Sequence, residues 1–178
     1  RARILPLVRI IAGEHRGRKI VTPPGRGTRP MLDRVREAVF SSLGAQLIGA
    51  KVLDLFAGSG SLGLEALSRG AKKSIFVESS KKHVEILLEN IEMLSLKQTK
   101  YELARTRAER WISNYADPEQ PCLVFLDPPF SSDEYKIILE KLAVLPAIRT
   151  ESLIVVESQG SREIMFAENM ELLKHRHY

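Results

Sequence analysis

The spacing of hydrophobic and polar residues changes close to residue 49. Before this point, residues 8–12 and 18–21 read as short strands on either side of a glycine-containing turn, which predicts a β-hairpin. Residues 22–30 hold three prolines and two glycines and are expected to form a loop. From Asp33 onward, apolar residues recur at helical spacing, and Asp33 itself is expected to cap that helix.

After residue 49, short apolar stretches alternate with amphipathic ones. We expect strands at residues 51–56, 74–78, 100–104, 122–126 and 153–157, and a sixth at 171–175. The segments between them predict helices, including one capped by Ser80 and one that begins with the capping box Ser131-x-x-Glu134. Such alternation predicts an α/β protein with a mostly parallel, Rossmann-like sheet that helices cover on both faces.

The chain has the size of one domain, with 178 residues and a mass of 20.0 kDa. No apolar run reaches the ~18 residues that a membrane-spanning helix needs, so no membrane partner is expected. The lone cysteine, Cys122, excludes an internal disulfide framework and a cysteine zinc cluster. This usage fits a reduced, cytoplasmic location. No metal site is expected.

Positive charge is concentrated at the N-terminal end. Residues 1–36 carry ten Lys or Arg and two acids, a net charge of +8, whereas the whole chain carries +5 and the remainder therefore −3. Nine of the ten basic residues are arginine, which favours phosphate binding over general solvation. We therefore predict contacts with nucleic-acid phosphates, against the alternative of a solvated charge run, at Arg16, Arg18, Lys19, Arg26, Arg29, Arg34 and Arg36.

The most distinctive apolar strand runs into a glycine-rich turn. Gly58, Gly60 and Gly63 match the dinucleotide fingerprint G-x-G-x-x-G, which alone is a weak signal. Asp54 at the strand's end suits a cationic ligand group, such as an α-ammonium, better than a pyrophosphate. Glu78 ends the next strand 24 residues later, close to the spacing of an acid that binds ribose hydroxyls.

The second chemical motif is Asp127-Pro128-Pro129-Phe130, which follows the strand expected at 122–126. The prolines fix an unusual backbone and leave carbonyls without competing local donors. A carboxylate, a carbonyl and an aromatic ring at the carboxyl edge of a sheet suit a planar base that carries an exocyclic amine.

Together these motifs resemble a class I S-adenosylmethionine-dependent methyltransferase that acts on an amine. The strings at residues 9–19, 29–30 and 33–40 narrow the resemblance to the RsmD family, the bacterial small-subunit rRNA guanine-N2 methyltransferases, over almost all of residues 8–178. The resemblance implies the class I methyltransferase fold after an N-terminal hairpin and helix. It also implies S-adenosylmethionine as cofactor, 16S rRNA in an assembled 30S subunit as substrate, and a monomer by default.

Carried over by position, Asp127 and the Pro128 carbonyl would accept hydrogen bonds from guanine N2, and Phe130 would stack on the base. Asp54 would hold the amino group of the cofactor and Glu78 its ribose. The Ala108 amide would meet adenine. The full set of cofactor residues implied is Asp54, Phe56, Ala57, Gly58, Ser59, Gly60, Glu78, Ser79 and Ala108.

Two departures from the family pattern stand out. Arg107 occupies the position where a small polar or acidic residue often approaches adenine. The fold normally has a seventh strand, antiparallel between strands five and six, and no segment for it is evident before Tyr178. We assign residues 1–48 to an RNA-binding appendage and residues 49–178 to the catalytic domain.

Other functions remain open from the residues alone. Adenine-N6 DNA and protein glutamine-N5 methyltransferases use related Pro-Pro-aromatic motifs, and an RNA-binding module with a vestigial cofactor pocket is the non-enzyme alternative. A dehydrogenase has no use for Asp127-Pro128-Pro129-Phe130. Pro121-Cys122 resembles the nucleophile of cytosine-C5 methyltransferases. However, Cys122 precedes Asp127 by five residues, ~16 Å along a strand, and is expected in the core.

Overall fold

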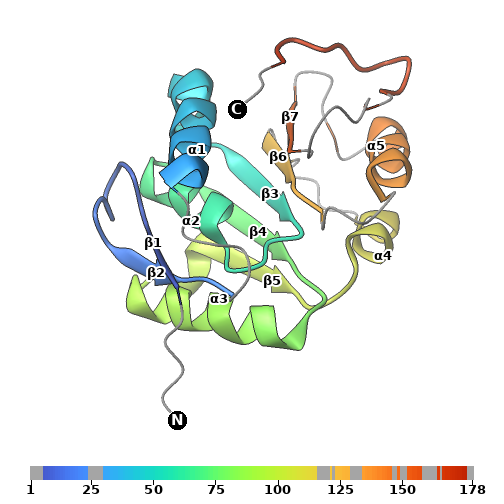
Figure 1. The fold of residues 1–178 in the computed structure, drawn as a ribbon. Helices are drawn as coiled ribbons and strands as arrows, with labels where there is room; N and C mark the ends of the chain where they lie inside the picture. The colour runs from blue at the N-terminus through green and yellow to red at the C-terminus, as the bar shows by residue number, and fades with distance from the viewer. Residues whose placement is uncertain are drawn as a thin grey trace.

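A computed structural model describes residues 6–23, 30–115, 121, 123–128, 134–145, 148, 152–157, 164 and 166–175. The predicted site residues Arg26, Arg29 and Phe130 lie outside these ranges, as do Cys122 and the first residues of the expected capping box. Figure 1 shows a twisted sheet between two layers of helices, with a hairpin packed on one layer. In the described part of the chain, no helix is both long enough and apolar enough to cross a membrane.

The main sheet has five parallel strands in the order β5-β4-β3-β6-β7. Their bounds are β3 Lys51–Leu55, β4 Lys73–Val77, β5 Tyr101–Ala104, β6 Leu123–Leu126 and β7 Leu153–Val156. All five residues of β3 are buried, as expected for a central strand that helices cover on both faces. The predicted α/β class and parallel sheet are confirmed, with strand ends within about two residues of those expected.

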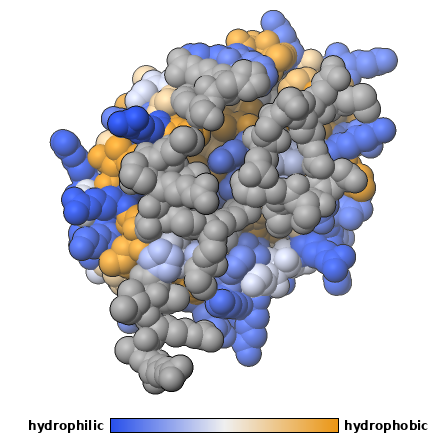
Figure 2. All heavy atoms as spheres, viewed as in Figure 1, coloured by the Kyte–Doolittle hydropathy of each residue, from blue (hydrophilic) through white to orange (hydrophobic). Residues whose placement is uncertain are grey.

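Two apolar layers sandwich this sheet. One face packs against α1 (Pro30–Leu43), α2 (Ser61–Ser68) and α3 (Lys81–Met93), and the other against α4 (Ala108–Ser113) and α5 (Glu134–Val144). Short 3₁₀ turns, η1 (Gly44–Leu47) and η2 (Gln98–Lys100), precede β3 and β5. Around the rim of the view in Figure 2, hydrophilic side chains project into solvent. The predicted cap of α3 is present, because Ser80 accepts a hydrogen bond from the His83 amide.

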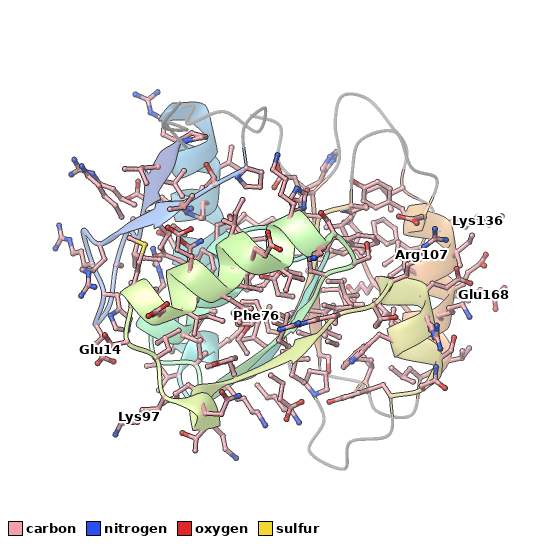
Figure 3. The ribbon with its side chains drawn as sticks, turned by 90° about the horizontal axis from the view of Figure 1, so that it is seen from below. Glu14, Phe76, Lys97, Arg107, Lys136 and Glu168 are labelled. Carbon is pink, nitrogen blue, oxygen red and sulfur yellow. The ribbon has the colours of Figure 1, made fainter. Side chains whose placement is uncertain are left out.

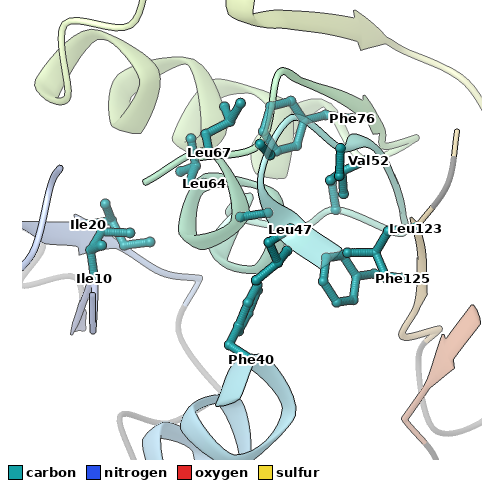
Figure 4. Close-up of a cluster of buried hydrophobic side chains, with 14 of the residues drawn as sticks. Ile10, Ile20, Phe40, Leu47, Val52, Leu64, Leu67, Phe76, Leu123 and Phe125 are labelled. Atoms are coloured by element: carbon teal, nitrogen blue, oxygen red, sulfur yellow. The ribbon is translucent and has the colours of Figure 1, made fainter. Parts of the chain in front are cut away.

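The N-terminal segment is part of the same core. Strands β1 (Leu7–Arg9) and β2 (Lys19–Val21) pair antiparallel, which confirms the predicted hairpin. Ile10 and Ile20 of this segment are buried with Phe40 of α1, and Phe40 meets the Phe125 ring of β6 at 5.4 Å between centroids (Figure 4). The described residues of the hairpin and of α1 therefore share a core with the sheet.

Helix α1 begins earlier than the sequence predicts. The sequence pattern puts Asp33 at the cap, but the helix starts at Pro30, so Asp33 lies inside it. Proline is favoured at the first helical position because its fixed φ suits a helix and its missing N–H is not needed there. The prediction for Asp33 is therefore wrong.

Buried polar groups fasten the hairpin to α2. Glu65 is fully buried and accepts hydrogen bonds from the Ile11 and Ala12 amides at 2.7 and 3.1 Å. Ser68 accepts from the His15 amide at 2.9 Å. The turn at Gly13 approaches so closely that a Cβ there would lie 1.7 Å from the Ser68 carbonyl oxygen. Only glycine fits this contact.

The described C-terminal residues do not continue the sheet. Residues 171–175 have no regular secondary structure, so the expected sixth strand is wrong. Leu172 and Leu173 are 56% and 70% exposed. A strand needs a hydrogen-bonded neighbour to satisfy its backbone, and apolar alternation alone does not supply one. Seven strands are present in the described residues, two in the hairpin and five in the main sheet.

Candidate active site

Three carboxylate residues lie at the carboxyl ends of neighbouring strands of the sheet. Asp54 lies near the end of β3, Glu78 directly after β4 and Asp127 directly after β6. Because β3 lies between β4 and β6 and all three strands are parallel, these residues share one edge of the sheet. With ~4.8 Å between strands, the ends of β4 and β6 are about 10 Å apart. Parallel α/β sheets bind ligands at this edge.

Asp54 is held in an unusual electrostatic environment. It is 2% exposed, and its Oδ2 accepts a hydrogen bond from the Gly63 amide at 2.9 Å. Burial raises the pKa of Asp54 to about 7, and the negative charge of Glu78 adds to this, although the bond from Gly63 acts in the opposite direction. A cation placed beside Asp54 would favour its ionised form. The site thus suits a positively charged ligand group.

Glu78 holds the glycine-rich turn. Its Oε2 accepts from the Gly58 amide at 2.8 Å and its Oε1 from the Ser80 amide at 2.7 Å. His83 Nδ1 lies 3.7 Å from Oε2. A carboxylate has about four acceptor sites, so these two bonds leave capacity for ligand hydroxyls. Glu78 therefore orders the turn before any ligand binds.

The glycines of the fingerprint have different roles. Gly58 has φ +58°, and among the described residues the nearest atom to a Cβ there would be the Phe56 carbonyl oxygen, at 3.9 Å. At Gly60, φ is +80° and a Cβ would lie 2.3 Å from Leu87 Cδ1. A Cβ at Gly63 would lie 2.3 Å from the Phe76 ring. Gly58 therefore faces open space where a ligand can approach, whereas Gly60 and Gly63 permit close packing of the turn.

Phe56 is the strained residue of this turn. Its φ of +62° is rare for a residue with a side chain. The next residue is tied to the neighbouring strand, since the Ala57 amide donates to the Val77 carbonyl at 3.0 Å. Strain of this kind persists where surrounding contacts enforce it, and it is frequent at ligand-binding turns.

Asn90 of α3 is a site residue that the sequence reasoning missed. It is fully buried, and its Nδ2 donates to the Ser59 carbonyl at 2.9 Å, which fixes the glycine-rich turn from the side opposite Glu78. The same side chain accepts from the Val21 amide at 2.7 Å and donates to the Val21 carbonyl at 2.9 Å. Asn90 thus links the hairpin to the turn. The available signal was a polar residue three positions after Leu87 on the apolar face of the helix.

The remaining predicted site residues lie along the same edge. Asp127 is half-buried and Pro128 buried, immediately after β6. Ser59 is buried in the turn, and Ser79 is exposed beside Glu78. Ala108 is buried at the first position of α4, which follows β5. The structure therefore brings the described catalytic and cofactor candidates to a single edge of the sheet.

The predicted RNA contacts divide into two groups. Arg16, Lys19 and Arg34 are exposed. Arg18 is exposed as well, although its guanidinium donates to the Met93 carbonyl at the end of α3. Arg36, in contrast, is 8% exposed and donates to the Arg9 carbonyl. Arg36 thus braces α1 against the hairpin, and its burial removes it from the surface available to a phosphate.

Comparisons with known proteins agree with this geometry. Residues 8–178 match the model of a family described as conserved hypothetical protein 95. Ribosomal RNA small subunit methyltransferase D of Haemophilus influenzae is 36% identical over 169 residues, which cover 95% of this chain and 88% of that protein. The protein of the same name from Escherichia coli strain K12 is 37% identical over 152 residues, 85% of this chain and 75% of its own length.

The solved structure of Escherichia coli yhhF has the same architecture. It superposes with a TM-score of 0.82 at 33% identity, over 94% of this chain and 90% of that one. The likeness therefore extends through the hairpin, the sheet and both helical layers.

Proposed function

We propose, because this chain belongs to the family described as conserved hypothetical protein 95, that it methylates the exocyclic N2 amine of a guanine in 16S rRNA. Family membership and the names of the relatives support an rRNA methyltransferase. The proposal adds S-adenosylmethionine as the methyl donor, guanine N2 as the acceptor, and an assembled 30S particle, approached by a monomer, as the substrate.

One observation carries the proposal: Asp127 lies at the end of the strand next to the glycine-rich turn, at the same edge as Asp54 and Glu78. The residues present fit the cofactor. Gly58 opens onto free space, Glu78 retains acceptor capacity, and buried Asp54 gains from a neighbouring cation. The ~10 Å between the β4 and β6 ends leaves room for a ribose at Glu78 and, attached to its 5′ carbon, a sulfonium group between Glu78 and Asp127.

In this mechanism the chain's residues bind and orient. Asp54 holds the amino group of the cofactor, and Glu78 holds its ribose hydroxyls. When bound, S-adenosylmethionine supplies an electrophilic sulfonium methyl group. Asp127 and the Pro128 carbonyl accept the hydrogens of guanine N2, which localises a nitrogen lone pair that the ring otherwise delocalises. The Asp127 carboxylate then takes up the proton that N2 loses on methylation. Phe130 stacks on the base. Rate acceleration then comes from positioning and electrostatics, without a covalent intermediate.

The activity test compares labelled methyl transfer from S-adenosylmethionine to 30S particles and to deproteinised 16S RNA, followed by nucleoside analysis. We expect N2-methylguanosine, with transfer to 30S particles favoured. Labelled N6-methyladenosine, or label in protein, would assign the site to another amine. RNA binding without any transfer would favour the non-enzymatic module.

The catalytic assignment has a separate test. Asp127→Ala removes one of two amine acceptors, so we expect kcat to fall on the order of 10²-fold or more, by analogy with loss of a preorganised electrostatic group. Cofactor affinity, measured by calorimetry, should change little because Asp54 and Glu78 remain. Near-normal turnover would make Asp127 a structural residue.

The basic N-terminal surface is proposed to hold RNA phosphates. Arg16→Ala combined with Arg18→Ala should weaken RNA binding and reduce its dependence on salt, by a little under one unit of log–log slope for each phosphate that the protein no longer binds. Cofactor affinity is the control. An unchanged salt slope would mean that these arginines are solvated and bind no phosphate. A loss of cofactor binding would show that the hairpin supports the site structurally.

A further inference from the structure

A basic depression lies beyond the edge strand, outside the cofactor and catalytic residues. The loop after β5 and the outer side of α4 border a shallow, open depression of about 480 Å³, lined in the described part of the chain by Arg105, Thr106, Arg110, Trp111, Asn114 and Tyr115. The predicted cofactor and catalytic residues that the structure describes do not line it. It is a separate surface at the same edge of the sheet.

The charge of this surface departs from its surroundings. Arg105, Arg107 and Arg110 are exposed, and no described carboxylate lies within ion-pair distance of their guanidinium groups. The acid closest in sequence, Glu109, instead lies 3.8 Å from Lys141 of α5. Residues beyond position 36 carry a net −3, so three uncompensated arginines within six residues form a local positive patch.

An aromatic wall stands beside this charge. The rings of Trp111 and Tyr115 stack with centroids 4.3 Å apart and an interplanar angle of 28°. Both side chains are half-buried and pack against the same apolar cluster that contains Ala108 and Ile112 of this helix, so each ring is supported from the protein side. Guanidinium groups next to an aromatic surface are the combination with which proteins bind single-stranded nucleic acids.

The position relative to Asp127 fits the same substrate. The order β5-β4-β3-β6 places three strand spacings, about 14 Å, between the ends of β5 and β6. At ~3.4 Å per nucleotide along a helical strand, this span corresponds to roughly four nucleotides. An RNA strand that presents a base at Asp127 therefore reaches the depression within its immediate flank.

We propose that the depression binds a single-stranded nucleotide flanking the target, with its base against Trp111 and adjoining phosphates at Arg105 and Arg110. This inference rests on the proposed function, because it takes RNA as the substrate. It adds a second RNA-contact surface, at α4 and the loop after β5, which is separate from the arginines of the hairpin.

The test uses two double substitutions (doublets) that lie beyond opposite ends of β5. Arg105→Gln with Arg110→Gln removes charge at the carboxyl end of β5, whereas Lys97→Gln with Lys100→Gln removes the same charge near its amino end (Figure 3 shows Lys97 and Arg107 far apart). All four side chains are exposed. Kd for deproteinised 16S RNA and for a short fragment around the methylated position is measured across a salt series, with cofactor affinity as a further control.

We expect the arginine doublet to raise Kd about tenfold and to lower the log–log salt slope by about 1.4, given ~0.7 per phosphate for single strands. The lysine doublet should change neither by more than about twofold. Trp111→Leu should also raise Kd about tenfold while leaving the slope unchanged, because stacking carries no counterion release.

Three results would overturn the inference. Equal effects of the two doublets on Kd would mean that only net charge matters. No effect of the arginine doublet would mean that the depression does not bind RNA. A parallel fall in cofactor affinity would assign it to the cofactor site. RNA binding is measured without turnover, so the two proposals can fail separately. If the parent protein binds RNA but methylates no guanine, the proposed function is wrong, and the two doublets still show whether the depression binds RNA.

Discussion

The two faces of the sheet are joined to their helices in different ways. On the face that carries the hairpin, α2 and α3, the buried polar side chains of Glu65, Ser68 and Asn90 bond to backbone groups of distant segments. On the face that carries α4 and α5, buried contacts are mainly apolar, and ion pairs lie at the surface. Apolar packing tolerates small shifts, whereas a buried hydrogen bond fixes position. The first face therefore sets where the hairpin and the glycine-rich turn stand.

The largest effect is expected at Asn90. Asn90→Leu leaves the Val21 amide and carbonyl and the Ser59 carbonyl without their buried partner, which should cost about 3–5 kcal/mol of unfolding free energy. Cofactor affinity should also fall about fivefold to tenfold, because the turn loses one of the hydrogen bonds that hold it. Urea denaturation and calorimetry measure the two effects.

The matched change on the other face is Leu142→Ala. Leu142 is fully buried in α5, so its truncation should cost a similar ~2–5 kcal/mol. Cofactor affinity should stay within about twofold, since Leu142 contributes only apolar packing and no hydrogen bond to the glycine-rich turn. If both variants lose cofactor affinity equally, the two faces do not differ in the way described.

The next effect concerns pH. The pKa of Asp54 is raised to about 7 in the folded chain, against about 3.9 when unfolded, so the folded state binds this proton more tightly. The associated stability is fully present below pH 4 and is lost as pH rises through 7. Between pH 5 and 7.5 the parent should lose roughly 2–3 kcal/mol that Asp54→Asn does not lose. Parallel pH profiles from urea denaturation would contradict this.

The glycine-rich turn offers a smaller contrast. Gly60→Ala places a methyl group against Leu87 in a left-handed backbone, which should cost about 1–3 kcal/mol of stability. Gly58→Ala meets open space and should cost only about 1 kcal/mol, but its methyl group occupies the ligand's approach. Calorimetry should show the greater loss of cofactor affinity for Gly58→Ala. Equal affinities in two folded variants would remove Gly58 from the binding surface.

The smallest effect is expected for a surface ion pair on the apolar face. Glu109 and Lys141 lie 3.8 Å apart with much of both side chains in solvent. Glu109→Gln should therefore change the unfolding free energy by about 0.5 kcal/mol or less, and less still in high salt. A loss above ~1.5 kcal/mol by urea denaturation would mean that polar contacts matter on this face too.

Whether the sequence predicts a feature depends on how far apart along the chain the interacting residues lie. The glycine-rich turn and the strand preceding Asp127 are short strings whose conformation depends on adjacent residues, and the structure places them as expected. The role of Asn90 depends on Val21, 69 residues away, so no local pattern reveals it. The sequence predicts a phosphate contact for Arg36 because arginine suits phosphate, whereas in the fold this side chain is buried and donates to the Arg9 carbonyl. The strand expected at 171–175 fails because alternation does not provide a pairing partner.

The link between the hairpin and Asn90 has a consequence for how the chain is made. A ribosome synthesises the N-terminal end first, so Ile10 and Ile20 leave the ribosome well before Glu65 and Asn90. Glu65 bonds to the amide of Ile11, 54 residues upstream, and Asn90 to that of Val21, 69 residues upstream. During that interval the segment cannot reach its final packing, and its apolar side chains stay accessible to chaperones and to other nascent chains. Folding of the first 48 residues is thus deferred until α3 has been synthesised.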